Sequence, residues 1–296
     1  MSIKQKTKVL VIVGPTASGK SALALELAQK YKGEIISADS RQVYRGLDIG
    51  TGKEKFPQHL VDVADVTEDY NVSDFVRDAQ KVIEEITARG HLPIIVGGTG
   101  FWIDSLVYGY ELPEVKPSKE LRDELETKTT GELFAQLQKL DLQRSKHIDK
   151  HNKRRLIRAL ELVMTTGKPV PQLKSESMYD ALWIGIKVQK IELEQRIAQR
   201  LDQWFEQGLI EETKRIPHPE RFGLAYAVIA KYLKGEIDLP AGKAGESQMR
   251  ANSLRSIIQY AKRQMTWFKR NENIRWVADV GDAENIISLS LDLQHR

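Results

Sequence analysis

The stretch KVLVIVGPTASGKS, residues 8–21, constrains the fold of this chain more than any other feature. A β-branched apolar run that ends in glycine is typical of a buried parallel strand. The segment from Gly14 to Ser21 fits the pattern G-x-x-x-x-G-K-[ST] and leads into residues 19–32, whose apolar spacing predicts a helix. A strand, a glycine-rich loop and a helix in this order predict a phosphate-binding loop.

Each residue type in this loop has a physical purpose. Glycines let the backbone fold around an anion, and the N-terminus of the helix adds positive potential. Lys20 would reach bridging or terminal phosphate oxygens, and the Ser21 hydroxyl would be a ligand of Mg²⁺. The alternative is a glycine-rich turn that matches by chance. The predicted loop comprises Gly14, Pro15, Thr16, Ala17, Ser18, Gly19, Lys20 and Ser21.

The order of the predicted elements indicates the fold class. Strands are predicted at 34–38 and 91–97, with a helix at 71–90 between them. Together with the first strand and helix, they predict a doubly wound α/β core, a parallel sheet of the P-loop NTPase type. A late apolar strand at 181–188 is expected to return to the same sheet.

A change of composition near residue 111 indicates a second domain. Pro113 and Pro117 stand in a charged segment that is typical of a boundary, and residues 120–167 are polar with helical leucine spacing. We therefore predict three segments. Residues 1–112 form the first part of the P-loop core, 113–180 a helical insertion, and 181–296 a return to the core that includes a basic C-terminal helix.

Asp39 is the one acidic residue at the end of a predicted core strand. The strand at 91–97 ends in Gly97-Gly98-Thr99-Gly100, where a motor-type P-loop ATPase would have an acidic residue. This disfavours a motor-type NTPase and leaves small-molecule kinases and other phosphate-handling transferases open. From the residues alone, Asp39 could be a magnesium ligand, a general base or a helix cap.

Composition limits the remaining classes of protein. The 296 residues carry a formal net charge of +4, which permits an anionic partner without requiring one. The chain has no cysteine, which excludes disulfides and thiolate chemistry. Its N-terminal apolar run is too short for a signal sequence or a membrane span, so we expect a cytoplasmic protein with no membrane partner. Nothing requires more than a monomer.

Two basic segments could bind nucleic acid. Residues 144–158 carry seven lysines and arginines, and 254–270 form a helical pattern with one apolar stripe and one basic face. Such charge runs are usually solvated helix faces. Trp267 could stack on unpaired bases or simply pack.

Five blocks of sequence resemble one known family. GPTASGKS, SADSRQVYRGLDIGTGK, PIIVGGTGFWI, RRLIRALEL and YAKRQMTWF occur, between residues 14 and 268, in the order found in tRNA dimethylallyltransferases (tRNA isopentenyltransferases). The resemblance implies that the loop holds the diphosphate of dimethylallyl diphosphate rather than ATP. It implies transfer of the dimethylallyl group to N6 of adenosine 37, beside the tRNA anticodon, with Mg²⁺ as cofactor.

The resemblance also implies roles for individual residues. Asp39 would be the base, Thr99 would hydrogen-bond in the same cleft, and Arg200 would bind the diphosphate or the charge of the transition state. The segment 221–237 departs from the family's Gly-Tyr-x-Glu pattern: Gly223 and Tyr226 have altered spacing and the glutamate is absent. Implied contacts with the tRNA anticodon stem-loop are Asp39, Ser40, Arg41, Gln42, Thr99, Arg122, Arg154, Arg155, Leu156, Ile157, Arg158, Lys262, Arg263, Gln264 and Trp267.

Other functions explain part of the same sequence. A P-loop small-molecule kinase explains residues 14–21 but leaves the RRLIR block and the basic helix without a purpose. An RNA-binding module with a vestigial P-loop leaves Asp39 and Thr99 unexplained. An adenylate prenyltransferase would act on free AMP or ADP, and turnover of the mononucleotide distinguishes it.

Overall fold

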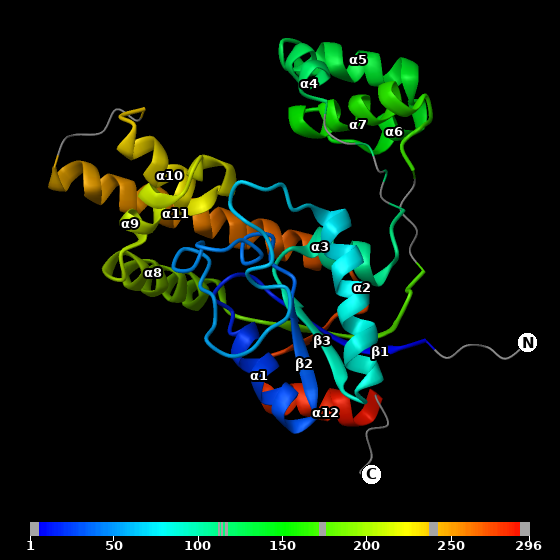
Figure 1. Cartoon of the computed structure of the whole chain (residues 1–296), viewed down its shortest axis with the longest axis vertical. Helices are drawn as coiled ribbons and strands as arrows, with labels where there is room; N and C mark the ends of the chain where they lie inside the picture. The colour runs from blue at the N-terminus through cyan, green and yellow to red at the C-terminus, as the bar shows by residue number, and fades with distance from the viewer. Residues whose placement is uncertain are drawn as a thin grey trace, which may run out of the picture. The chain divides into compact units, whose positions relative to one another are not determined.

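The computed structural model describes residues 6–111, 113, 115, 118–171, 176–236 and 242–290. The chain divides into two compact units, one made of Met1–Gly109 with Ser177–Arg296 and the other of Tyr110–Glu176 (Figure 1). No helix in the described ranges has the length and apolar character needed to cross a membrane.

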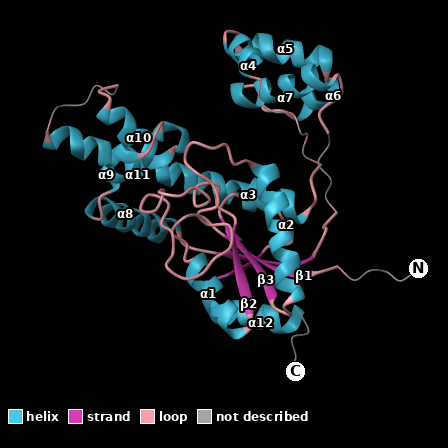
Figure 2. Ribbon diagram, in the orientation of Figure 1, coloured by secondary structure: helices cyan, strands magenta, loops and turns pink. Residues whose placement is uncertain are grey.

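The larger unit contains a five-stranded parallel sheet, drawn in magenta in Figure 2. Its strand order is β2-β3-β1-β4-β5, which places β1 at the centre and the loop after β1 between two neighbouring strand ends. The predicted α/β class with a parallel core sheet is confirmed. The strands are β1 (Lys8–Val13), β2 (Gly33–Ser37), β3 (Leu92–Gly97), β4 (Asp180–Ile186) and β5 (Arg275–Val277).

Alternate residues of β1 belong to two hydrophobic cores, one on each face of the sheet. Val9, Val11 and Val13 pack in the larger core, whereas Leu10 and Ile12 pack in the smaller one. This is why the strand is apolar at every position from Val9 to Val13. The helices of this unit are α1 (Lys20–Lys30), α2 (Val72–Ala88), α3 (Gly100–Val107), α8 (Lys190–Glu206), α9 (Leu209–Arg215), α10 (Leu224–Leu233), α11 (Lys243–Phe268) and α12 (Val280–Ser290), with a 3₁₀ turn at Pro219–Phe222.

The smaller unit is helical and has its own core. Side-chain caps start its helices: Ser118, Thr129, Asp141 and Asn152 each accept a hydrogen bond from a backbone N–H of the first turn. Its helices are α4 (Lys119–Glu126), α5 (Thr130–Leu140), α6 (Leu142–His147) and α7 (Lys153–Thr166). Its bounds lie close to the predicted insertion 113–180, although Asp180 already belongs to β4 of the larger unit.

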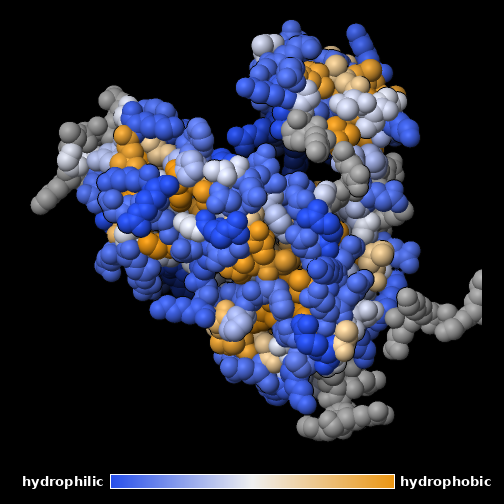
Figure 3. All heavy atoms as spheres, in the orientation of Figure 1, coloured by the Kyte–Doolittle hydropathy of each residue, from blue (hydrophilic) through white to orange (hydrophobic). Residues whose placement is uncertain are grey.

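Hydrophilic residues cover most of the face drawn in Figure 3, with hydrophobic residues visible in patches. Among the described residues, the large hydrophobic side chains that are exposed are scattered along the sequence, such as Ile191 and Leu289. Scattered exposure of this kind is ordinary for a globular protein.

Candidate active site

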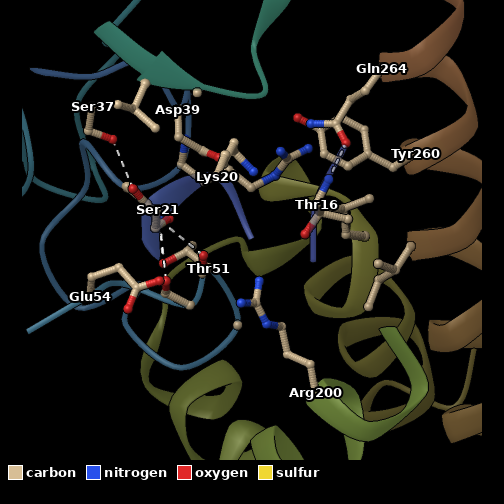
Figure 4. Close-up of a pocket in the computed structure, with 18 of the residues that line it drawn as sticks. Thr16, Lys20, Ser21, Ser37, Asp39, Thr51, Glu54, Arg200, Tyr260 and Gln264 are labelled. Carbon is tan, nitrogen blue, oxygen red and sulfur yellow. Dashed lines mark hydrogen bonds between the residues drawn. The ribbon is translucent and has the colours of Figure 1, made fainter. Parts of the chain in front are cut away.

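A pocket lies in the larger unit, lined by the loops that follow β1 and β2, by the end of β3, and by α8 and α11 (Figure 4). The carboxyl ends of parallel strands meet at one edge of a sheet, which is where α/β proteins bind ligands. The lining includes Thr16, Lys20, Ser21, Ser37, Asp39, Arg41, Gln42, Thr51, Gly52, Glu54, Gly97, Arg200, Trp204, Tyr260 and Gln264.

The loop between β1 and α1 has the conformation of an anion cradle. Gly19 has a φ of 94°, a left-handed conformation that favours glycine, and it forms the N-cap of α1. The N–H of Ser18 donates to the carbonyl of Pro15 (3.2 Å), which closes a tight turn. The Ser18 hydroxyl is buried and has no hydrogen-bond partner. A donor held without a partner inside this loop fits a bound anion.

Two cations from different elements face this cradle. Burial, and to a smaller extent the neighbouring Arg200, lower the pKa of Lys20 to about 8, while Asp39 and Glu54 act in the opposite direction. Burial likewise lowers the pKa of Arg200, with Glu54 opposing. An anion with several negative charges would satisfy both cations, and a diphosphate is such an anion.

Gln264 connects α11 to the cradle. Its side chain is 4% exposed; its Oε1 accepts from the N–H of Thr16 (2.9 Å) and its Nε2 donates to the carbonyl of Gly98 (3.0 Å). The amide thus ties the P-loop to the end of β3 from a residue far along the chain. A tRNA contact by Gln264 stays a prediction, and both polar ends of its side chain already have protein partners.

Asp39 and Thr99 stand at the ends of β2 and β3. Asp39 Oδ1 accepts from the N–H of Arg41 (2.9 Å), and Thr99 Oγ1 accepts from the N–H of Ser40 (3.1 Å). Residues 40–46 form turns with an isolated bridge at Tyr44, and no helix starts there, so Asp39 is not a helix cap. The general base and the magnesium ligand remain as its possible roles.

Arg41 and Gln42 brace the loop that carries Asp39. Arg41 Nε donates to the carbonyl of Phe222 (2.7 Å), and its guanidinium lies 4.8 Å from the ring centre of Tyr260. Gln42 Nε2 donates to the carbonyl of Thr51 (3.2 Å), and its Oε1 accepts from the Ser37 hydroxyl (2.8 Å). Any contact of these residues with tRNA is additional to these structural roles.

Tyr260 is a pocket residue that the sequence reasoning missed. Burial raises the pKa of its phenol, and the nearby Arg41 acts in the opposite direction. The block YAKRQMTWF begins at this residue, one turn before Gln264, and helical spacing alone would have placed the two on one face.

Trp267 packs against α3 in this structure. Its indole Nε1 donates to Asp104 Oδ2 (2.7 Å), and its ring contacts Phe101 edge to face, with 6.1 Å between ring centres. The sequence allowed either packing or base stacking for Trp267. The structure shows the packing, and base stacking by Trp267 stays a prediction. Lys262 and Arg263 on the same helix are exposed.

In the helical unit, two of the predicted RNA-binding arginines hold a buried carboxylate. Glu161 has an exposed fraction of 0%, and it accepts two hydrogen bonds from Arg122 (2.9 Å each) and one from Arg158 (2.6 Å). Leu156 and Ile157 are buried in the core of the unit, a packing that does not favour RNA contact by their side chains. Arg154 and Arg155 are exposed.

Oxygen ligands for a magnesium ion are available in the pocket. The described residues contain no cluster of three or more His, Asp or Glu side chains that could hold a metal by themselves. Mg²⁺ does not require one, because it is commonly held by one or two side chains and by substrate phosphates. Ser21, Asp39 and Glu54 line the same pocket and fit such an arrangement.

Comparison with known proteins assigns the chain to a family. The model of the family IPP transferase matches residues 42–271. The chain belongs to the IPP transferase family. A second family, isopentenyl transferase, matches residues 7–64.

Known members of the IPP transferase family align with this chain over most of its length. It is 41% identical to a tRNA dimethylallyltransferase of Enterococcus faecalis over 91% of each chain, and 39% identical to one of Anoxybacillus flavithermus over 91% of this chain and 89% of the relative. The resemblance seen in the sequence blocks is confirmed.

Solved structures of the family share the fold. The full-length tRNA isopentenylpyrophosphate transferase of Bacillus halodurans aligns with a TM-score of 0.71 at 34% identity, covering 97% of both chains. A eukaryotic dimethylallyltransferase described as acting on tRNA aligns with a TM-score of 0.74 at 26% identity, over 97% of this chain and 79% of that one.

Proposed function

We propose that this protein transfers the dimethylallyl group of dimethylallyl diphosphate to N6 of adenosine 37, beside the anticodon of tRNA, and releases diphosphate. One observation carries the proposal: a single pocket joins a P-loop and two cations, Lys20 and Arg200, to the carboxylate of Asp39. The names and the extent of identity of the relatives support the same reaction.

In the proposed reaction a bond forms between N6 of adenine and C1 of the dimethylallyl group. The bond between C1 and oxygen breaks, and its electron pair leaves with the diphosphate, whose negative charge Lys20 and Arg200 stabilise. Asp39 accepts the proton that N6 loses. Because the exocyclic amine is a weak nucleophile, a carboxylate placed to remove its proton favours the reaction.

Mg²⁺, when bound, would neutralise charge on the diphosphate, with the Ser21 hydroxyl among its ligands. Thr99 lies within hydrogen-bonding distance of Ser40 beside Asp39, and we assign it to holding the acceptor base. A water-poor pocket matters because water would also capture an allylic centre.

Each unit carries exposed cations that we propose contact the RNA. Arg154 and Arg155 start α7, and Lys262 and Arg263 lie on α11. Such side chains contact phosphates, which position an RNA without selecting its sequence. The target adenosine must leave its stack to reach the pocket. We propose that the protein acts as a cytoplasmic monomer.

The test is transfer of radiolabel from dimethylallyl diphosphate, with Mg²⁺, to an anticodon stem-loop that has adenosines at positions 36 to 38. Parallel reactions contain AMP in place of the RNA, or ATP in place of the prenyl donor. Label in the RNA supports the proposal. Label in AMP alone indicates an adenylate prenyltransferase, and consumption of ATP without prenyl transfer indicates a kinase; either result refutes the proposal.

A further inference from the structure

A carboxylate outside the pocket binds the backbone of a loop that lines it. Glu212, on α9, accepts hydrogen bonds from the N–H groups of three successive residues: Asp48 (3.1 Å), Ile49 (2.8 Å) and Gly50 (3.1 Å). Bonds from backbone N–H groups to an ionised carboxylate are stronger than bonds between neutral groups. Glu212 therefore holds this loop in one conformation.

A buried tyrosine fixes Glu212 in turn. Tyr226, on α10, is 1% exposed, and its hydroxyl donates to Glu212 Oε1 (2.5 Å). The same ring packs against the loop so closely that a Cβ on Gly50 would lie 2.6 Å from its Cζ atom. Only glycine leaves room for the loop and the tyrosine together.

The loop held in this way reaches the candidate active site within two residues. Thr51, Gly52 and Glu54 line the pocket, and a Cβ on Gly52 would lie 3.7 Å from Arg200 Nη1. The backbone of 51–52 also receives the hydrogen bonds of Gln42. Any shift of residues 48–50 would therefore move the groups that surround Lys20 and Arg200.

Tyr226 belongs to the segment that departs from the family's sequence pattern. Just before it, the carbonyl of Phe222 accepts the hydrogen bond of Arg41, and the Phe222 ring contacts Tyr44 edge to face, with 5.1 Å between ring centres. The altered segment thus braces two parts of the loop that follows Asp39.

We propose that Glu212 and Tyr226 are positioning residues for the reaction: through the backbone of residues 48–50 they set the place of Thr51, Gly52 and Glu54 around the diphosphate. The inference rests on the proposed function for its meaning in catalysis. A loop displaced by about 1 Å is enough to slow an enzyme by a factor on the order of 100.

The test compares Glu212→Gln and Tyr226→Phe with two matched controls, Glu211→Gln on the same helix as Glu212 and Tyr232→Phe on the same helix as Tyr226. Glu211 is exposed and pairs with Lys214. Three quantities are measured: amide hydrogen exchange of peptides that cover 47–53, the Kd of inorganic pyrophosphate with Mg²⁺, and kcat for label transfer to the stem-loop.

We expect exchange in 47–53 to rise about tenfold in both test variants, while peptides from β1 and β3 keep their protection. Pyrophosphate binding should weaken and kcat should fall, about tenfold to a hundredfold in Glu212→Gln and less in Tyr226→Phe, whose ring still packs. Both controls should match the wild type.

Unchanged kcat and pyrophosphate affinity in both test variants would overturn the inference, as would loss of activity with faster exchange throughout the core. The pyrophosphate measurement needs no acceptor. If the wild type prenylates no RNA but pyrophosphate binding still weakens in Glu212→Gln, the proposed function fails and the positioning role stands.

Discussion

At the scale of single residues, the candidate site contains charges that the folded protein holds at a cost. Burial and the proximity of Arg200 lower the pKa of Lys20 to about 8, although Asp39 and Glu54 favour its charged form. The fold keeps two cations near one cradle, where Arg200 disfavours the charged form of Lys20. A bound anion would remove this repulsion, so the same arrangement that costs stability increases affinity for diphosphate.

Asp104 gives a second example of a buried charge, with a testable pH dependence. Burial raises its pKa to about 6, although the hydrogen bond from Trp267 acts in the opposite direction. Between the ordinary pKa of an aspartate and pH 6, the folded state binds the extra proton. Stability therefore falls as pH rises through that range and stays lower above it.

Asp104→Asn removes the charge and keeps an oxygen that can accept from Trp267. We expect it to raise the free energy of unfolding on the order of 2 kcal/mol at pH 8, and much less at pH 4.5. Urea denaturation at both pH values measures this. An equal effect at the two pH values, or a loss at pH 8, would show that the charge of Asp104 is not the cause.

Gln264→Leu tests the amide that joins α11 to the P-loop. The substitution leaves the N–H of Thr16 and the carbonyl of Gly98 without their partner, which should cost roughly 1–3 kcal/mol of stability. We also expect a higher KM for the prenyl donor, because the cradle loses a brace. Gln259→Leu, on an exposed face of the same helix, is the control. A stable variant with an unchanged KM would contradict the bracing role.

At the scale of elements, α11 shows how one helix serves both core and pocket. Ile257, Ala261 and Phe268 are buried as the apolar spacing predicted, while Tyr260 and Gln264 line the pocket between them. The periodicity identifies which face is buried. It does not reveal that Gln264, a polar residue on that face, binds the P-loop, because its hydrogen-bond partner Thr16 lies 248 residues away in the sequence.

The limits of the sequence reasoning follow from this distance. The strand, P-loop and helix of residues 8–30 were predictable, because their pattern is local and each residue type has a backbone reason. The bonds from Glu212 to residues 48–50 span more than 160 residues, and no local signal marks them. The basic run that ends at Arg158 shows a second limit, which does not depend on distance along the sequence. Its charge alone did not reveal that Arg158 pairs with Glu161, only three residues away.

Glu161 should stabilise the helical unit through its two arginines. Burial raises its pKa, but the hydrogen bonds from Arg122 and Arg158 outweigh burial and hold the pKa below its usual value. Its contribution is therefore present above the pKa of an unfolded glutamate and is lost as pH falls through the lowered value.

We expect Glu161→Gln to cost roughly 1–3 kcal/mol at pH 7, since the two half-buried arginines lose a charged acceptor. Glu124→Gln, an exposed residue on α4 that pairs with Lys128, should cost less than about 0.5 kcal/mol. Denaturation of the full chain at pH 7, followed by circular dichroism, compares the two. Equal costs would mean that burial of Glu161 has no energetic consequence.

At the scale of the whole molecule, exposed cations in each of the two units are proposed to contact RNA phosphates. Each exposed cation that contacts a phosphate releases counterions, so log Kd depends on log salt concentration with a slope of about 0.7 per contact on single strands. Replacing Arg154 and Arg155 by glutamine removes two such contacts and should lower this slope by about 1.4, and so should replacing Lys262 and Arg263.

Filter binding of the stem-loop between about 50 and 200 mM salt measures the slopes. Lys81→Gln, on the exposed face of α2, is the control that should leave the slope unchanged. If either pair of substitutions leaves the slope at the wild-type value, that segment does not contact RNA phosphates.

The most direct test of the central claim is the single-turnover rate of label transfer for Asp39→Asn, with RNA and dimethylallyl diphosphate both saturating. The account predicts a fall of about 10²- to 10⁴-fold, with the Kd values of RNA and of pyrophosphate changed less than about threefold. A single-turnover rate equal to that of the wild type would contradict the assignment of Asp39 as the base. Loss of pyrophosphate binding with an unchanged rate at saturation would make Asp39 a magnesium ligand instead.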